Sequence, residues 1–233
     1  MARILLVRHG QTNGFLTDGY TDLTPTGVAQ ARALGTWLRA RGEVPTAVVV
    51  GPQPRHEQTW RHAAEAAGGW PDPVRDPGLD EHDGARAVLE GAQQGLLDPA
   101  QLQGAVEAFE ASEGRRAALR LFRGAMERWV AGSLDVPGAE PWPVFRARVG
   151  AALDRLAARG VPGGTVLAFT SGGVVGAAVA TVLGLPSEAG ALDLSFEVAN
   201  ASLTELRVSG RRRGLHAFNL AAHLGDAVPW TAV

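Results

Sequence analysis

Short apolar runs alternate along the chain with longer segments in which apolar residues recur every three or four positions. The first kind of pattern predicts buried strands, at residues 3–8, 47–50 and 165–170. The second kind predicts helices, which we place at residues 28–42, 55–67, 142–159 and 172–183. Thr24 or Thr26 is the expected N-cap of the first helix. Two last strands are expected near residues 192–208 and 214–219.

Strands that alternate with helices at this spacing are typical of a parallel sheet covered by helices. We therefore expect a single α/β domain over residues 1–233, a three-layer α/β/α sandwich with a mostly parallel central sheet. Residues 85–135 differ, because they combine helical periodicity with no convincing strand. This segment is predicted to be a helical cap inserted over the active site.

Charge and composition narrow the range of functions. The net charge is −2, from 22 basic and 24 acidic residues, which provides no field for binding nucleic acid or an anionic membrane. The single basic cluster, Arg211–Arg213, is expected at the solvated tip of a hairpin. The chain has no cysteine and no apolar stretch near the ~20 residues of a membrane helix, so we expect a cytoplasmic protein.

Polar residues follow the predicted strands where each one ends, and the carboxyl ends of such strands are where α/β sheets bind ligands. The first strand ends in an arginine and a histidine and is followed by a polar loop. An arginine at the start of a helix follows the second strand, and acidic residues follow a later segment. Another helix begins directly after the 165–170 strand. The residues concerned are Arg8, His9, Gln11, Thr12, Asn13, Arg55, Glu81, His82, Ser171 and Gly172.

This set of groups suits phosphoryl transfer. Guanidinium groups match the oxygens of a phosphate, and a helix N-terminus adds amide donors. A neutral imidazole can attack phosphorus, while a carboxyl group can protonate the leaving alcohol. No metal or other cofactor is expected, since no His/Asp cluster has the spacing of metal ligands.

Three phrases in the same order resemble those of the histidine phosphatase superfamily, also called the phosphoglycerate mutase-like family. LVRHGQT contains the family's RHG motif, GPQPRHEQTW keeps Arg55, Gln58 and Thr59 of a downstream phrase, and Leu79-Asp80-Glu81 matches the phrase that contains its acid. LTPTGVAQARALGTWL and the closing NASLTELRV…LHAFNLAAHL are also similar, so the resemblance covers most of the chain. The helical segment 85–135 is its least typical part.

The resemblance implies roles for individual residues. His9 would accept the phosphoryl group and form a phosphohistidine that water hydrolyses, Arg8 and Arg55 would clamp the phosphoryl oxygens, and Glu81 would protonate the leaving group. Gln11, Thr12, Asn13, Ser171, Gly172 and His82 are expected to contact the substrate. That substrate is expected to be a small phosphate ester, and apolar helix faces can support a homodimer.

One position departs from the family pattern. Members usually have a second histidine after the late strand, and here Ser171 occupies its place. Loss of a charge-assisted donor weakens stabilisation of the transition state by roughly 2–4 kcal/mol if nothing compensates. His56, where alanine is usual, and His82 are the candidates for compensation, and we favour His82 because it lies on the active-site loop.

Three alternatives remain open. A phosphate-binding or regulatory module could keep the fold without turnover, which the missing histidine motivates. A serine esterase could use Ser171, with Asp193 and His216 following in the expected order. A mutase would need a pocket that retains the ester and blocks water.

Overall fold

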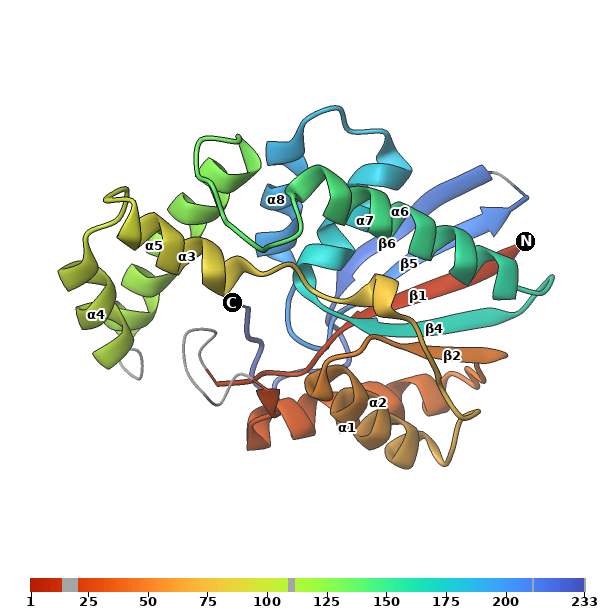
Figure 1. Ribbon diagram of the computed structural model, residues 1–233. Helices are drawn as coiled ribbons and strands as arrows, with labels where there is room; N and C mark the ends of the chain where they lie inside the picture. The colour runs from red at the N-terminus through yellow and green to blue at the C-terminus, as the bar shows by residue number, and fades with distance from the viewer. Residues whose placement is uncertain (14–20, 109–111, 211, 233) are drawn as a thin grey trace.

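The apolar runs form the centre of one six-stranded sheet, as predicted (Figure 1). The computed structural model describes residues 1–13, 21–108, 112–210 and 212–232. The sheet has the order β3-β2-β4-β1-β5-β6. Its strands are β1 (Ala2–Arg8), β2 (Ala47–Val50), β3 (Val74–Arg75), β4 (Thr165–Thr170), β5 (Leu203–Ser209) and β6 (Arg212–Leu220). The first four are parallel, whereas β5 and β6 form an antiparallel edge next to β1, so the sheet is mostly parallel.

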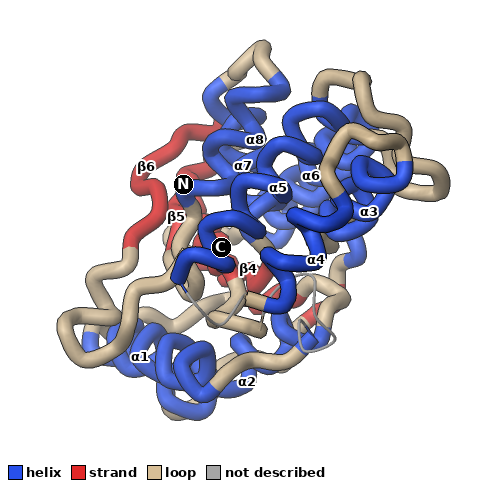
Figure 2. Tube along the Cα trace, turned by 90° about the vertical axis from the view of Figure 1, so that its left-hand side faces the viewer, coloured by secondary structure: helices blue, strands red, loops and turns tan. Residues whose placement is uncertain are grey.

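Alternate residues of the strands point to opposite faces of the sheet, and each face has its own core. Leu5 and Val7 pack with Leu34 and Leu38 of α1 (Pro25–Ala40) and with Ala63 of α2 (Pro54–Ala67). The opposite face packs against the later helices, α6 (Trp142–Arg159), α7 (Gly172–Leu183) and α8 (Glu188–Glu197). Figure 2 shows the sheet between these two layers of helices, which confirms the predicted three-layer sandwich.

The segment expected to cap the sheet is helical. It forms α3 (Gly84–Gln93), α4 (Pro99–Glu107) and α5 (Ser112–Val130). In Figure 1 these three helices lie beyond the carboxyl end of β1. Over the described ranges, none of the helices in the molecule is both long and apolar enough to cross a bilayer.

The start of α1 is fixed by its cap and by a close backbone approach. Thr24 is the N-cap, and its hydroxyl accepts a hydrogen bond of 3.1 Å from the amide of Gly27. A Cβ atom on Gly10 would lie 2.5 Å from the carbonyl oxygen of Gly27, so only glycine fits at that position. The turn after β1 therefore lies directly against the first turn of α1.

One predicted strand is wrong over part of its length. Residues 192–197 belong to α8, and the strand begins only at Leu203. The run Leu-Asp-Leu-Ser-Phe alternates like a strand, but Ser187 caps a helix by accepting from the amide of Gly190. Ala191 and Ser195 are then buried one helical turn apart and pack closely against Gly176 of α7, so tertiary packing decides the conformation.

The expected hairpin is formed by β5 and β6, with Gly210 in its turn. Arg211 lies outside the described residues, so its predicted place at the tip is not described. Arg212 and Arg213 belong to β6, where Arg213 forms an ion pair with Asp154 of α6.

An ion pair between the buried carboxylate of Asp76 and the exposed Arg155 fixes the chain just before Glu81. Asp76 accepts hydrogen bonds of 2.8 and 2.7 Å from Arg155 of α6 and one of 2.8 Å from the amide of Gly78. The hydrogen bonds from Arg155 lower the pKa of Asp76 below its usual 3.8. The pair thereby holds the short 3₁₀ turn Pro77–Leu79 that leads into the site.

We expect Asp76→Asn to lower the free energy of unfolding by about 1–2 kcal/mol at pH 7, because it removes the charge that Arg155 binds. The loss is no larger because Arg155 is exposed, and water weakens the ion pair. Since the native state lowers the pKa of the carboxyl, its stabilisation is complete above pH 3.8 and is lost as pH falls through the native pKa. Urea unfolding of the wild-type protein and of Asp76→Asn should therefore show a difference in the free energy of unfolding that becomes smaller below pH 4. As a control, Asp193→Asn, at an exposed pair with Arg123, should change stability by less than about 0.5 kcal/mol. A difference that grew on acidification would contradict this assignment.

Candidate active site

Six of the ten predicted polar residues meet near the carboxyl ends of β1 and β4, which are neighbours in the sheet. Arg8 is paired with Thr170 in the register of these strands. The chain continues from β1 to α1 on one face and from β4 to α7 on the other, so the two connections diverge at this point. Such a point, where the connections separate, is the preferred ligand site of an open α/β sheet.

The backbone and ring of His9 are both fixed by hydrogen bonds. Its amide donates to Thr170 of β4 at 2.8 Å, and its carbonyl accepts from the amide of Ala201 at 3.1 Å. Its Nδ1 lies 2.8 Å from the carbonyl oxygen of Gly10. Because a carbonyl can only accept, Nδ1 carries the proton, and the lone pair of the neutral ring is on Nε2. Nε2 is thus the nitrogen able to act as a nucleophile.

The surroundings of His9 keep its ring neutral. The side chain is almost fully buried, and burial is the main reason that its pKa lies well below 6.5. The positive charges of Arg55 and then Arg8 lower the pKa of His9 further. Positive charge close to the ring thus favours its neutral form.

The two arginines reach the site from different elements. Arg8 ends β1, and its guanidinium donates to the carbonyl of Val198 and lies against Gly172. Arg55 is in the first turn of α2. The side chains of both arginines are buried, each about 4% exposed. Thr59, one turn further along α2, accepts from the amide of Gly10 at 3.0 Å. The phrase that contains Arg55 therefore also holds the turn after His9.

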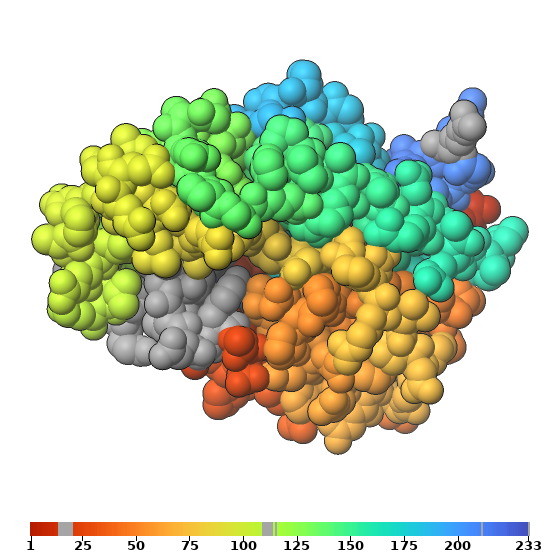
Figure 3. All heavy atoms as spheres, in the orientation of Figure 1, coloured from red at the N-terminus to blue at the C-terminus, as the bar shows by residue number. Residues whose placement is uncertain are grey.

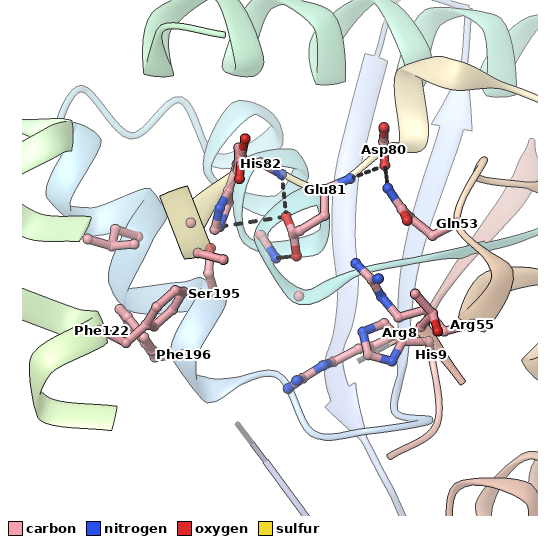
Figure 4. A pocket seen from close by; sticks show the side chains of 17 residues that line it. Arg8, His9, Gln53, Arg55, Asp80, Glu81, His82, Phe122, Ser195 and Phe196 are labelled. Atoms are coloured by element: carbon pink, nitrogen blue, oxygen red, sulfur yellow. Dashed lines mark hydrogen bonds and ion pairs between the residues drawn. The ribbon is translucent and has the colours of Figure 1, made fainter. Parts of the chain in front are cut away.

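Glu81 is bound to the N-terminus of α7. One carboxylate oxygen accepts from the amide of Gly173 at 3.0 Å, and the other accepts from the amide of His82 at 3.0 Å. The carboxylate of Asp80 accepts hydrogen bonds from the side-chain amide of Gln53 at 2.6 Å and from the backbone amide of Glu81 at 2.9 Å. Figure 4 shows this chain of contacts from Gln53 through Asp80 to Glu81 and His82.

These groups line one pocket of about 410 Å³. In Figure 3 the surface is hollowed between the yellow segment, around residues 75–105, and the red and orange N-terminal part of the chain. The pocket has a basic side formed from β1 and α2, an acidic side formed from the segment after β3, and an apolar side formed from α5 and α8. Its lining residues are Arg8, His9, Thr21, Gln53, Arg55, Asp80, Glu81, His82, Asp83, Gly84, Ala85, Phe122, Gly172, Gly173, Leu192, Ser195 and Phe196.

The structure thus brings together six of the ten residues singled out from the sequence: Arg8, His9, Arg55, Glu81, His82 and Gly172. It does not place the other four in the pocket wall. The Gln11 side chain bonds to Thr24, Thr12 bridges to Leu23, and Asn13 is exposed. Ser171 is fully buried behind the wall.

Ser171 has a histidine partner, His56, which is the less favoured of the two candidates for replacing the missing histidine. His56 Nε2 lies 2.7 Å from the Ser171 hydroxyl, and both side chains are fully buried. Burial, and then the charge of Arg55, lower the pKa of His56 to about 3, so this ring is neutral. The rings of His56 and His9 are 5.9 Å apart. An imidazole is therefore present beside His9, but it belongs to α2 rather than to position 171.

His82, which we favoured, lies in the pocket wall among aromatic rings. Its Nε2 is 3.6 Å from Glu81, and its ring contacts Trp129, Trp142 and Phe145.

The Asp and His residues proposed for an esterase triad with Ser171 lie elsewhere in the structure. Asp193 pairs with Arg123, and His216 bonds to Arg207. Among the described residues, no group of three or more His, Cys, Asp or Glu side chains is arranged to hold a metal ion.

Several lining residues were not singled out from the sequence. Asp80 directly precedes Glu81, and Gln53 lies two residues before Arg55, so their positions in the segments that follow β3 and β2 were a usable signal. Phe122 lies within the predicted helical segment 85–135, and Ser195 and Phe196 lie within the strand that the sequence predicts near residues 192–208. Nothing in the local sequence around these three indicates that they share a pocket.

Comparison with known proteins agrees with this geometry. The family model of the histidine phosphatase superfamily (branch 1) matches residues 4–94 and 85–221, so the chain belongs to this superfamily. A 2,3-bisphosphoglycerate-dependent phosphoglycerate mutase of Novosphingobium aromaticivorans is 36% identical over 100 residues, which cover 40% of this chain and 44% of that protein. A second 2,3-bisphosphoglycerate-dependent phosphoglycerate mutase, from Erythrobacter litoralis, is 39% identical over 72 residues, which cover 29% of this chain and 32% of that protein. These matches span less than half of the length of each mutase.

Solved structures match over nearly the whole chain. A mycobacterial glucosyl-3-phosphoglycerate phosphatase, solved with VO3, has a TM-score of 0.64 and 25% identity, and the match covers 94% of this chain and 99% of that one. The α-ribazole phosphatase of Shigella flexneri has a TM-score of 0.65 at 18% identity, covering 94% and 96% of the two chains, and is similar in fold.

The neutral state of the buried histidines can be measured directly. Because the native pKa values of His9 and His56 lie well below 6.5, their ring resonances should not titrate as pH falls from 7.5 to 5.5. Two-dimensional NMR of histidine-labelled protein, assigned with His9→Gln and His56→Gln, tests this. An inflection for His9 above pH 5.5 would show that its ring is charged in the working range.

The contact between positions 56 and 171 predicts the outcome of exchanging their side chains. Ser171→His alone should overpack the buried space that His56 fills and lower both stability, by about 1–3 kcal/mol, and activity. The double variant His56→Ala/Ser171→His should recover much of both, because the total volume is restored. Urea unfolding and kcat/KM on a generic phosphate ester measure the two effects. Losses that simply add in the double variant would show that the positions are not coupled.

Proposed function

We propose that this protein hydrolyses small phosphate monoesters through a phosphohistidine on His9, without a metal ion. The observation that carries the proposal is the state of His9: a buried neutral ring, protonated on Nδ1, between two arginines. A neutral ring offers its Nε2 lone pair to phosphorus, and the arginines attract the phosphate that must approach it.

The reaction would proceed in two steps. In the first, His9 Nε2 attacks phosphorus, the ester P–O bond breaks, and Glu81 gives its proton to the leaving alcohol. In the second, Glu81 takes a proton from water as the water oxygen attacks phosphorus, and the P–N bond breaks to release phosphate. Arg8 and Arg55 would bind the phosphoryl oxygens throughout, where loss of one such donor typically costs about 3–4 kcal/mol of transition-state stabilisation.

Hydrolysis is favoured over phosphoryl transfer to a second alcohol. The relatives named as mutases match less than half of their own length, whereas the structure of a named phosphatase at 25% identity matches 94% of this chain. A mutase must also keep the intermediate from water. A non-catalytic phosphate binder is supported less well, because binding alone has no use for Glu81 held at the N-terminus of α7.

The first experiment is phosphoenzyme trapping. After rapid mixing with p-nitrophenyl phosphate, we expect an acid-labile, base-stable phosphoryl group on the protein, and His9→Gln should remove both this group and turnover by at least about 10³-fold. Ser171→Ala serves as the matched control and should retain the phosphoenzyme. If His9→Gln kept its activity while Ser171→Ala lost it, the nucleophile would be the serine. Phosphate binding without turnover of any ester would indicate a binding module.

A further inference from the structure

We propose that the alcohol part of the substrate is uncharged and carries an apolar group of about the size of a ring. This inference rests on the proposed function and adds the class of substrate. It comes from two features of the pocket beyond the reacting groups, its balance of charge and its apolar wall.

The described lining residues provide basic charge for one phosphate. Among the described residues that line the pocket, Arg8 and Arg55 are the only arginines, and both lie beside His9. Two guanidinium charges balance one phosphate dianion. The remaining acidic side chains of the wall are Asp80, Asp83 and Glu81, of which Glu81 carries the proton that the proposed first step uses. Asp83 is partly compensated by an ion pair of 3.2 Å with Arg86, which lies outside the lining.

A second anionic group on the substrate would therefore meet carboxylates rather than a cation. Like charges placed opposite each other in a partly buried site are unfavourable. Residues 14–20 and 109–111 contain neither Arg, Lys nor His. The charge balance thus disfavours leaving groups with a carboxylate or a second phosphate.

The side of the pocket away from the arginines is apolar. Phe122 of α5 and Phe196 of α8 meet edge to face, with ring centres 5.9 Å apart, and Leu192 lies beside them. The Phe122 ring packs so closely on Gly84 that a Cβ there would lie 2.8 Å from it. Figure 4 shows the two rings across the pocket from Arg8, His9 and Arg55.

The size of the pocket fits this assignment. A volume of about 410 Å³ lies in the range of sites for small organic ligands, and it exceeds what a phosphate alone needs. An alcohol bound with its phosphate at the arginines extends toward Phe122 and Phe196. Burial of a ring against this wall should favour it over a polar alcohol of similar length.

The test compares three primary alkyl phosphates, so that the leaving alcohols have similar reactivity: 2-phenylethyl phosphate, glycerol 3-phosphate and 3-phosphoglycerate. The full chain should show kcat/KM in that descending order, with about tenfold or more between the first and the last. Equal or better turnover of 3-phosphoglycerate would overturn the inference and leave the proposed function intact. No phosphoenzyme and no turnover of any ester would instead refute the proposed function.

Two variants test the two features separately. Ala85→Arg adds a cation to the wall on α3 and should raise kcat/KM for 3-phosphoglycerate about tenfold relative to 2-phenylethyl phosphate, whereas Ala85→Gln, similar in length and uncharged, should not. Leu89→Arg, on the same helix but exposed and outside the lining, should leave the ratio unchanged.

Phe122→Ala should reduce the preference for 2-phenylethyl phosphate over glycerol 3-phosphate by about tenfold, mainly through KM. Retained turnover of glycerol 3-phosphate would show that the variant is folded. A preference that survived the loss of this ring would show that the apolar wall does not bind the alcohol.

Discussion

The hydrogen bond between His9 Nδ1 and the carbonyl of Gly10 determines the chemistry of the whole site, because it decides which nitrogen can react. The bond forms only if the chain turns sharply after β1, and the turn is fixed from three sides. The Gly10 amide donates to Thr59 of α2, the backbone of Gly27 in α1 lies against Gly10, and the His9 amide donates to Thr170 of β4. The first helices and the central strands thus jointly hold one imidazole in one orientation.

The same arrangement solves an electrostatic problem. A phosphate needs positive charge nearby, yet a nucleophilic histidine must remain uncharged. Burial together with Arg55 and Arg8 lowers the pKa of His9, so in the proposed reaction the groups that would attract the phosphate also keep the nucleophile neutral. His56 fits this scheme, since its own lowered pKa of about 3 allows it to support Ser171 as a neutral ring without adding a further charge beside His9.

Much of the fold and the position of the candidate catalytic residues could be predicted from the sequence, because both depend on local patterns. The helices at residues 142–159 and 172–183 and the strand at residues 165–170 have the predicted bounds, and the strand ends located Arg8, His9, Arg55 and Glu81. What could not be predicted depends on contacts between distant segments. The alternating run at residues 192–197 is helical because it packs on α7, and His56 meets Ser171 only because α2 and α7 begin at neighbouring strands.

The central claim is that phosphorus becomes bonded to Nε2 of His9, and the nitrogen itself can be identified. Protein labelled with ¹⁵N in its histidines would be trapped as the phosphoenzyme and examined by NMR for coupling between phosphorus and each ring nitrogen. The structure predicts coupling to Nε2 of His9, with the proton retained on Nδ1. Coupling to Nδ1, or a phosphoryl group on another residue, would contradict the account.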